Sequence, residues 1–439
     1  MVLVYFSDIT VKQSQKVSLK NNFSRLFFIL IVIMAAIFKS NLTKLRSKHQ
    51  NGLKLQKLAI NLLLTNFEVI KVKTKIKWIK LESIHQPLKR PFVTALHRVT
   101  EAAAIRARIG LENGLVGYGA ATPNEKVTGD SLKSLAVIMD EVIKPQLLGQ
   151  DISDWEKLLN LLQHSIQYNT PAKAAFEIAL YDLRAQLFQT SLTELLGAAP
   201  RAIATDYTIS ISPAPQMLQE ARQLVAQGFT SLKIKLGDQS LADDIQLVKQ
   251  IAGVCPDNVS LRIDVNQAWN IRQTLAAINS WEKANLKIDF VEQPVKANDL
   301  WGMQQLVAKS AIPIMADESV HSFVDARRLI ELHACDLINI KLMKTGGLSQ
   351  AVRINQLAES AGIQCMIGCM IEAPESIAAA IAFAAAQENV VFVDLDAVFM
   401  TQAAGISRGF SSHKNQLLPS SSVGLGFNSN QVRGEEAWN

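Results

Sequence analysis

Charged side chains recur at the ends of successive β-rich segments in the second half of the chain. In sequence order these residues are Lys235, Asp264, Glu292, Asp317 and Lys341. They are separated by 29, 28, 25 and 24 residues, about the length of one strand and one helix. Side chains in this register meet at one end of a parallel sheet, so the spacing predicts a shared pocket.

Three of these residues are carboxylates whose grouping favours a divalent cation. Asp264, Glu292 and Asp317 would repel one another inside a protein unless a cation joined them. All-oxygen ligands suit Mg²⁺, or Mn²⁺ as a substitute, better than Zn²⁺. The seven histidines form no HxH or HExxH pattern, which argues against a histidine-based metal site. We expect one Mg²⁺ per subunit.

Lysines flank the predicted metal site. Lys235 and Lys341 lie on the strands before and after the three carboxylates, and Lys233 lies two residues from Lys235. A lysine acts as a base only when neutral, and neighbouring cations lower its pKa. Any one of these charges alone would be a helix cap or a solvated loop residue. Their common register instead predicts a carboxylate substrate with one lysine on each face of its α-carbon.

The segments that must position these residues alternate between strands and helices. Eight β-rich runs are separated by amphipathic helical stretches, and they span residues 206–211, 231–236, 261–265, 288–294, 313–318, 336–342, 363–368 and 390–395. This alternation predicts an α/β fold with parallel pairing and right-handed crossovers. A doubly wound sheet is the alternative, but eight regular units favour a closed (β/α) barrel.

A different pattern precedes the barrel. From residue 75 apolar and polar residues alternate, and Asn113–Gly114 separates two such runs, which predicts antiparallel strands joined by a turn. Residues 130–196 follow a helical pattern. We therefore expect an α+β domain over 74–200, the barrel over 201–397 and a C-terminal segment over 398–439.

Residues 1–73 differ from the rest of the chain in charge. They hold 12 Lys and Arg but two Asp and Glu, which leaves 33 and 37 for residues 74–439. The basic charge is therefore confined to this segment, and we expect no nucleic-acid partner. The apolar run 26–38 is too short for a full membrane span. A targeting or anchoring segment and a divergent extension are alternatives, but we favour a stretch outside the working protein, because the globular pattern begins near residue 75.

The four cysteines form no CxxC pair, which is typical of a reducing compartment and favours a cytoplasmic location. Membrane association is not expected, although residues 26–38 leave it open. The number of subunits is also left open.

Several of these segments resemble the enolase superfamily, in its muconate-lactonizing subgroup. The likeness is carried by KIK (233–235), RIDVNQAW (262–269), VEQPV (291–295), MADES (315–319) and NIKLMKTGG (339–347). A lysine base with Mg²⁺ is the known pattern of this superfamily. The resemblance spans roughly residues 75–427. It implies a modified TIM barrel, (β/α)₇β, with an α+β capping domain formed by the N-terminal and C-terminal segments, the latter including residues 424–426.

Within the subgroup, the chain is most similar to the dipeptide epimerases. PLKRPFVTAL (87–96), VTGDS (127–131), GCMIE (368–372) and VDLDA (393–397) carry this likeness. It implies that Asp394 and Asp396 bind a dipeptide's ammonium group, which suits an acidic pair. It further implies an isomerase that inverts the α-carbon of the C-terminal residue of an L-Xaa-L-Xaa dipeptide. The reaction is a 1,1-proton transfer through a metal-stabilised enediolate, and the implied biological role is salvage of cell-wall peptides.

Two positions depart from the Ala-Glu epimerase pattern. In those enzymes an arginine follows the T-A-L of the cap loop and pairs with the substrate glutamate, whereas this chain has His97, with Arg98 next to it. A neutral histidine is a poorer carboxylate partner than a bidentate arginine. Cys369 stands where the family often has serine, and with Met370 it is expected to line the substrate pocket. The catalytic residues are present, while glutamate specificity is in doubt.

Two alternatives remain. An o-succinylbenzoate synthase or a cycloisomerase would use the same scaffold, but its substrate lacks an ammonium group for Asp394 and Asp396. A binding or membrane-associated protein without turnover is favoured only by residues 26–38.

Overall fold

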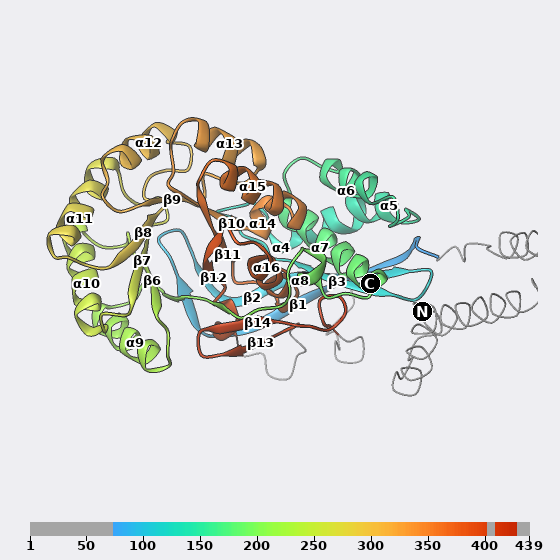
Figure 1. The fold of residues 1–439 in the computed structure, drawn as a ribbon, viewed down its shortest axis with the longest axis horizontal. Coiled ribbons are helices and arrows are strands. Elements are labelled where there is room, and N and C mark those ends of the chain that lie inside the picture. The colour runs from blue at the N-terminus through green and yellow to red at the C-terminus, as the bar shows by residue number, and fades with distance from the viewer. Residues whose placement is uncertain (1–72, 402–408, 428–439) are drawn as a thin grey trace, which may run out of the picture. The chain divides into compact units, whose positions relative to one another are not determined.

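The computed structural model describes residues 73–401 and 409–427 (Figure 1). The apolar run 26–38 and the rest of residues 1–72 lie outside the described residues. Within the described ranges, no helix combines the length and the apolar character needed to span a membrane.

The described chain begins with a three-stranded antiparallel sheet in the order β1-β2-β3. Its strands are β1 (Ile76–Val93), β2 (Arg98–Leu111) and β3 (Val116–Ala121). The expected turn at Asn113–Gly114 joins β2 to β3, and Gly114 has a φ of 89° that glycine adopts easily. At the other end of β1, the Thr94 N–H donates to the carbonyl of His97 (3.0 Å), closing the tip of a long hairpin.

Helices cover this sheet and complete the cap. They are α4 (Leu132–Val137), the π-helix η1 (Ile138–Ile143), α5 (Lys144–Leu147), α6 (Trp155–His164), α7 (Thr170–Leu187) and α8 (Leu192–Leu195). The long helix α7 lies directly against β3. A Cβ at Gly119 would stand 2.0 Å from the carbonyl oxygen of Ala175, so this close approach depends on glycine.

The eight-stranded parallel sheet has the order β12-β11-β10-β9-β8-β7-β6-β5. Its strands are β5 (Tyr207–Ile209), β6 (Ser231–Lys235), β7 (Ser260–Asp264), β8 (Ile288–Glu292), β9 (Ile314–Ala316), β10 (Leu337–Lys341), β11 (Gln364–Gly368) and β12 (Val390–Asp394). Helices connect them: α9 (Ala214–Ala226), α10 (Leu241–Val254), α11 (Ile271–Lys283), α12 (Leu300–Lys309), α13 (Phe323–Glu331), α14 (Leu342–Thr345) with α15 (Leu348–Ser360), and α16 (Pro374–Ala386). The predicted α/β fold, a (β/α)₇β barrel, is confirmed, and each strand lies within one residue of its predicted segment.

The barrel closes between its first and last strands without a regular ladder. The Asp206 N–H donates to the carbonyl of Val393 (3.1 Å), and the Leu395 N–H donates to Oγ1 of Thr205 (2.9 Å). This seam lies beside the end of β12, and the short helix α17 (Ala397–Met400) follows it.

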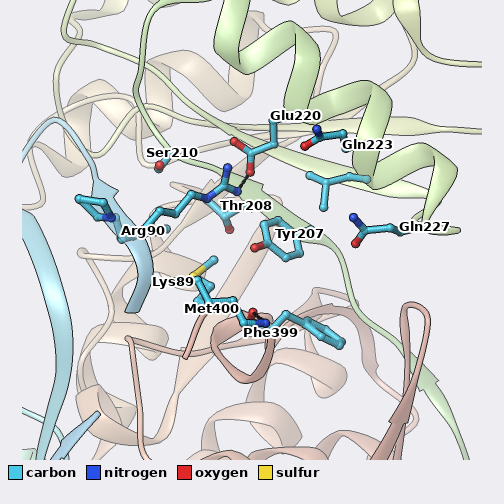
Figure 2. Close-up of a pocket in the computed structure, with 13 residues that line it drawn as sticks. Lys89, Arg90, Tyr207, Thr208, Ser210, Glu220, Gln223, Gln227, Phe399 and Met400 are labelled. Atoms are coloured by element: carbon cyan, nitrogen blue, oxygen red, sulfur yellow. Dashed lines mark hydrogen bonds and ion pairs between the residues drawn. The ribbon is translucent and has the colours of Figure 1, made fainter. Parts of the chain in front are cut away.

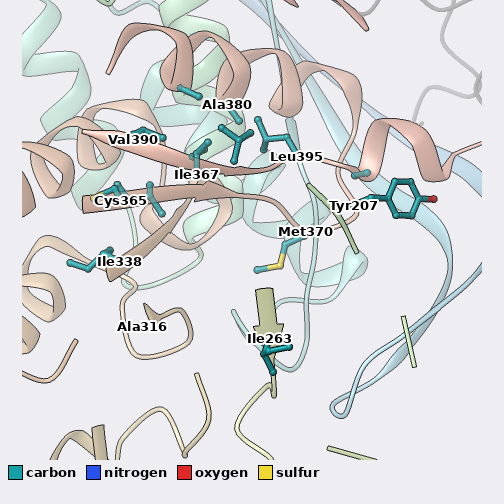
Figure 3. Close-up of a cluster of buried hydrophobic side chains, with 14 of the residues drawn as sticks. Tyr207, Ile263, Ala316, Ile338, Cys365, Ile367, Met370, Ala380, Val390 and Leu395 are labelled. Atoms are coloured by element: carbon teal, nitrogen blue, oxygen red, sulfur yellow. The ribbon is translucent and has the colours of Figure 1, made fainter. Parts of the chain in front are cut away.

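Alternation along the strands separates the hydrophobic core from the charged interior. Figure 3 shows Ile263 of β7, Ile338 of β10 and Ile367 of β11 among the buried apolar side chains. On β6, Ile234 belongs to the same cluster, whereas its neighbours Lys233 and Lys235 form ion pairs with carboxylates of other strands. Successive side chains of a strand point to opposite faces, so the apolar set packs toward the helices and the charged set lies inside the barrel.

The C-terminal segment returns to the cap, as the resemblance implied. β13 (Phe410–His413) pairs with β14 (Gln416–Pro419), which in turn pairs with β4 (Ile203–Ala204). The Leu425 N–H then donates to Oδ1 of Asp182 on α7 (2.9 Å), and the Leu192 N–H donates to the carbonyl of Gly424 (2.9 Å). Cap and barrel lie within one compact unit that begins at Lys73, and the boundaries at 200 and 397 stay predictions.

A buried carboxylate fixes the cap to the barrel. Glu177 of α7 accepts from the N–H of Ser349 (2.6 Å), in the first turn of α15, and from Nε2 of Gln163 (2.6 Å). Because α15 begins at a glycine that offers no side-chain cap, Glu177 supplies this acceptor from the cap domain. Burial raises the pKa of Glu177 to about 7.

Candidate active site

The structure brings the charged ends of successive strands together inside the barrel. Lys235 is in register with Asp264, and Asp264 is in register with Glu292. Asp317 directly follows β9, and Lys341 is the last residue of β10. None of these five side chains belongs to a residue more than 6% exposed.

Each of the three predicted ligands forms an ion pair with a lysine. Nζ of Lys235 lies 2.5 Å from Oδ2 of Asp264, and Nζ of Lys341 lies 2.7 Å from Oδ2 of Asp317. Lys233 holds the middle of the cluster, because its Nζ lies 2.7 Å from Oε2 of Glu292 and 3.1 Å from Oδ2 of Asp264. The lysines predicted to be catalytic therefore lie in direct contact with the carboxylates predicted to bind metal.

Burial and charge act against each other on these groups. Burial alone lowers the pKa of Lys341, but the ion pair with Asp317 outweighs it and raises that pKa. Burial, followed by repulsion from Asp264, raises the pKa of Glu292 to about 7. Glu292 thus resists ionisation in this interior, and additional positive charge would favour its charged form. For Asp264 and Asp317 the neighbouring lysines outweigh burial and lower the pKa.

The donor set fits a hard divalent cation. Asp264, Glu292 and Asp317 come from the ends of three adjacent strands and offer only carboxylate oxygens. Two further contacts orient them. Nδ2 of Asn339 donates to Oε1 of Glu292 (2.8 Å), and Nζ of Lys344 donates to Oδ1 of Asp317 (2.5 Å).

A second acidic group lies at the seam of the barrel. Asp394 ends β12, and its Oδ2 lies 2.7 Å from Nζ of Lys233. Asp396 accepts a hydrogen bond from the backbone N–H of Thr208 on β5 (2.6 Å). Burial and the charge of Asp394 raise the pKa of Asp396 to about 7. Lys233 therefore links this acid pair to the predicted metal ligands.

The hairpin tip carries the two cap residues predicted to contact substrate. Half-buried His97 has its Nδ1 3.3 Å from Oγ1 of Thr94. Burial, then the charges of Lys235 and Lys341, lower its pKa, so His97 is neutral at pH 7 and lies within electrostatic reach of both lysines. Arg98 is exposed at the start of β2. Of the two, His97 is the residue that lies near the lysines.

Cys369 and Met370 directly follow β11. Burial, then the charges of Asp394 and Asp396, raise the pKa of the half-buried Cys369, which places the thiol near the acid pair. Sδ of Met370 accepts from Nδ2 of Asn124 in the cap (3.5 Å), and Met370 is also part of the hydrophobic core. Cys369 thus lies within electrostatic reach of the acid pair, while Met370 joins barrel and cap.

Sequence reasoning missed three buried polar residues of the site. They are Asp206, Asn339 and Lys344. A period of two places Asn339 on the face of Lys341, and it places Asp206 on the face of Thr208. Lys344 follows Lys341 by three residues, about one helical turn. These spacings are visible in the sequence, but no chemistry was assigned to them.

A cavity of about 330 Å³ lies next to the acid pair (Figure 2). It is bounded by the end of β1, by β5, by α9 and by α17, and Arg90 forms an ion pair with Glu220 on its wall. Thr208 lines this cavity and also binds Asp396. None of the residues predicted from sequence for the site lines it.

Comparison with known proteins gives consistent matches along both domains. Residues 78–197 match the family described as mandelate racemase/muconate lactonizing enzyme, N-terminal domain, and residues 216–432 match the family described as enolase C-terminal domain-like. The chain is 40% identical to an L-Ala-D/L-Glu epimerase of Bacillus subtilis over 80% of this chain and 96% of that protein.

Solved structures agree with these matches. A substrate-liganded complex of the Bacillus subtilis L-Ala-D/L-Glu epimerase has a TM-score of 0.79 at 39% identity, covering 80% of this chain and 98% of that chain. A dipeptide epimerase from Enterococcus faecalis, complexed with Mg and L-Leu-L-Tyr, has a TM-score of 0.77 at 38% identity, covering 80% and 99%.

Proposed function

The chain belongs to the enolase superfamily, and from that premise we propose that it is a Mg²⁺-dependent dipeptide epimerase. It inverts the α-carbon of the C-terminal residue of an L-Xaa-L-Xaa dipeptide by 1,1-proton transfer. The observation that carries the proposal is one buried network with two distinct ends. Lys233 contacts Glu292 at the lysine-rich end and Asp394 at the acidic end.

Asp264, Glu292 and Asp317 are the residues that hold the Mg²⁺, one per subunit, with Mn²⁺ as a substitute. Bound Mg²⁺ supplies positive charge that attracts the substrate's terminal carboxylate and makes the adjacent α-proton more acidic. Asn339 and Lys344 keep Glu292 and Asp317 in fixed orientations through the hydrogen bonds described above.

Lys235 and Lys341 are the acid/base residues. They come from β6 and β10, on either side of the strands that carry the predicted ligands. One removes the α-proton, and the other delivers a proton to the opposite face. Each residue is 6% exposed, so both lysines lie in a largely enclosed part of the barrel. Lys233 assists Lys235 from the same strand, since its Nζ also lies close to Oδ2 of Asp264 (3.1 Å).

Asp394 and Asp396 bind the dipeptide's ammonium group. A buried acid pair suits a cationic ligand, whereas the substrates of an o-succinylbenzoate synthase or a cycloisomerase offer no cation. The relatives support the same reading, because the Enterococcus faecalis structure is described with Mg and a dipeptide.

The residue that is inverted carries an uncharged side chain. A neutral His97 at the hairpin tip offers no fixed positive charge to a glutamate side chain. Cys369 and Met370 contribute sulfur-containing, largely apolar surface to the opposite wall. A cytoplasmic location and a role in salvage of cell-wall peptides belong to the same proposal.

The test is proton exchange on candidate substrates. The full chain is incubated with Mg²⁺ in D₂O and pooled L-Ala-L-Xaa dipeptides, and deuterium uptake is read by mass spectrometry. We expect single-deuteron gain on members with uncharged C-terminal residues. Absence of exchange on every member, with the protein folded and metal bound, would contradict the proposed function and favour the dehydratase or cycloisomerase alternatives.

A further inference from the structure

Asp206 is a fully buried carboxylate beside the acid pair that the reaction above does not use. It precedes β5 and is 0% exposed. One carboxylate oxygen from each of Asp206, Asp394 and Asp396 lies within 4.8 Å of the others. An acidic group in this position needs an explanation, because buried carboxylates repel one another.

One oxygen of Asp206 has no donor. Its Oδ2 accepts from Nη1 of Arg262 (2.8 Å), whereas Oδ1 has no hydrogen-bond partner among the described residues. Buried acceptors are nearly always paired, so an orphaned carboxylate oxygen indicates a missing donor.

The positively charged side chains that contact Asp206, Asp394 and Asp396 do not neutralise all three carboxylates. Lys233 contacts Asp394 but also Glu292 and Asp264. Arg262 contacts Asp206 but divides its charge with Asp289, whose Oδ2 lies 3.1 Å from its Nε. Burial and the charge of Asp394 raise the pKa values of Asp206 and Asp396, as expected where negative charge is in excess.

The spacing of the three carboxylates matches a primary ammonium group. Such a group has three N–H donors in a tetrahedral arrangement. Acceptors about 2.8 Å from its nitrogen stand about 4.6 Å apart. The three carboxylate oxygens lie within 4.8 Å of one another, which allows that separation. We propose that Asp206 is the third carboxylate of the ammonium site, so that one N–H of the dipeptide's ammonium points to each of Asp206, Asp394 and Asp396.

A divalent metal ion at this cluster is the competing occupant. Each carboxylate already has a donor: Arg262 on Asp206, Lys233 on Asp394 and the Thr208 N–H on Asp396. Oδ1 of Asp394 also accepts from Oγ1 of Thr208 (3.5 Å). Of the two occupants, the ammonium group is the one that the proposed substrate supplies, and a metal ion at this cluster is an outcome that the test below distinguishes. The inference rests on the proposed function, since it is the dipeptide that brings the ammonium group.

The test compares a dipeptide with its desamino analogue, the N-acyl amino acid that lacks only the ammonium group. Binding of both to the Mg²⁺-loaded full chain is measured by isothermal titration calorimetry, in wild type and Asp206→Asn. We expect the variant to bind the dipeptide about tenfold more weakly, with a much smaller change for the analogue. The matched control is Asp289→Asn, which removes the other partner of Arg262 and should leave the ratio of the two affinities unchanged.

Other results separate the possibilities. Equal weakening of both ligands in Asp206→Asn would assign Asp206 a structural role and overturn the proposal. The proposal would also be overturned if wild type bound a second metal ion per chain and Asp206→Asn lost that ion. If Asp206→Asn fails to fold, Asp206→Glu is used instead, because it keeps the charge beside Arg262 but displaces the carboxylate oxygens. A ratio of dipeptide affinity to analogue affinity equal to that of wild type would then overturn the proposal. Wild type that binds no dipeptide at all contradicts the proposed function and this inference together.

Discussion

The two ends of the buried network differ in how their charges are balanced. At the lysine-rich end, Asp264, Glu292 and Asp317 lie against Lys233, Lys235, Lys341 and Lys344. At the acidic end, Asp206, Asp394 and Asp396 lie against Arg262 and a shared Lys233. A lysine contacts every predicted metal ligand at the first end, whereas negative charge is in excess at the second. A zwitterion fits such a pocket in one orientation, with its carboxylate toward the lysines.

The two ends also differ in how the fold builds them. The lysine-rich end comes from contiguous strands, β6 to β10, whose ladders hold the side chains in register. The acidic end lies at the seam between β5 and β12, where the Thr208 N–H binds a side chain instead of a neighbouring strand. Strand pairing thus positions the lysine-rich end, where the proposed proton transfer takes place. At the acidic end the pairing is interrupted, so the backbone N–H of Thr208 is able to orient Asp396.

The largest expected effect is loss of metal binding at the lysine-rich end. Glu292→Gln keeps the size of the side chain but removes one of three anionic ligands. We expect the affinity for Mg²⁺, measured by calorimetry without substrate, to fall by more than about 100-fold. Substitution of a residue that only orients a metal ligand typically lowers metal affinity by about 10- to 100-fold. Glu318→Gln is the matched control, since Glu318 is buried nearby but binds Asn266 (3.2 Å). Equal losses in both variants would argue against the assigned ligands.

A smaller effect is expected at the acidic end. Asp396→Asn removes one anionic partner of the ammonium group and retains the hydrogen bond from Thr208. A hydrogen bond to a charged group is worth about 1.5–3 kcal/mol, so KM for a dipeptide should rise about 10- to 100-fold. Mg²⁺ affinity, titrated in parallel, should change little. An unchanged KM would remove the basis for treating this end as the ammonium site.

The acidic end should also respond to pH. Because its pKa is raised to about 7, Asp396 gains a proton and loses its charge as the pH falls below 7. KM for a dipeptide should therefore rise as the pH drops, by at most about tenfold per pH unit. Asp396→Asn should lack this rise. A KM that is constant from about pH 8 to about pH 5.5 in wild type is inconsistent with an ionised Asp396 in binding.

The smallest effect concerns His97, at the hairpin tip within electrostatic reach of Lys235 and Lys341. His97→Arg introduces a permanent charge where the wild-type side chain is neutral. The ratio of kcat/KM for L-Ala-L-Glu over L-Ala-L-Leu should increase by up to about tenfold, or about 1.4 kcal/mol. Arg98→Ala changes an exposed neighbour and should leave the ratio unaltered. A decrease in the ratio for His97→Arg would show that the tip does not face the substrate side chain.

The lysine-rich end was predictable because its residues follow the repeat of the fold. One charge per βα unit, from Lys235 to Lys341, is a signal that can be found along the sequence alone. The ends of the strands lie within two residues of the ends of the predicted segments. Asn339 and Lys344 are less evident in the sequence. Asn339 lies two residues before Lys341, on the same face of a strand, and Lys344 lies three residues after it, about one helical turn away.

The acidic end was predicted only in part, because its geometry depends on contacts distant in sequence. Asp206 is separated by 188 residues from Asp394, and nothing local marks the two as neighbours. The seam that joins them is a tertiary feature, created where the first strand meets the last. The π-helical turn over Ile138–Ile143 was likewise expected only as helix, since a change of hydrogen-bond register inside a helix leaves little trace in residue pattern.

The central claim is that two lysines act on opposite faces of one α-carbon. It is tested most directly by deuterium exchange into L,L- and L,D-dipeptides with Lys235→Ala and Lys341→Ala, using the full chain with Mg²⁺. We predict that each variant loses epimerization by about 10²- to 10⁴-fold. Each should still exchange the α-proton of one diastereomer, and the two variants should act on opposite diastereomers. Exchange of the same diastereomer by both variants, or epimerization near the wild-type rate by either, would contradict the account.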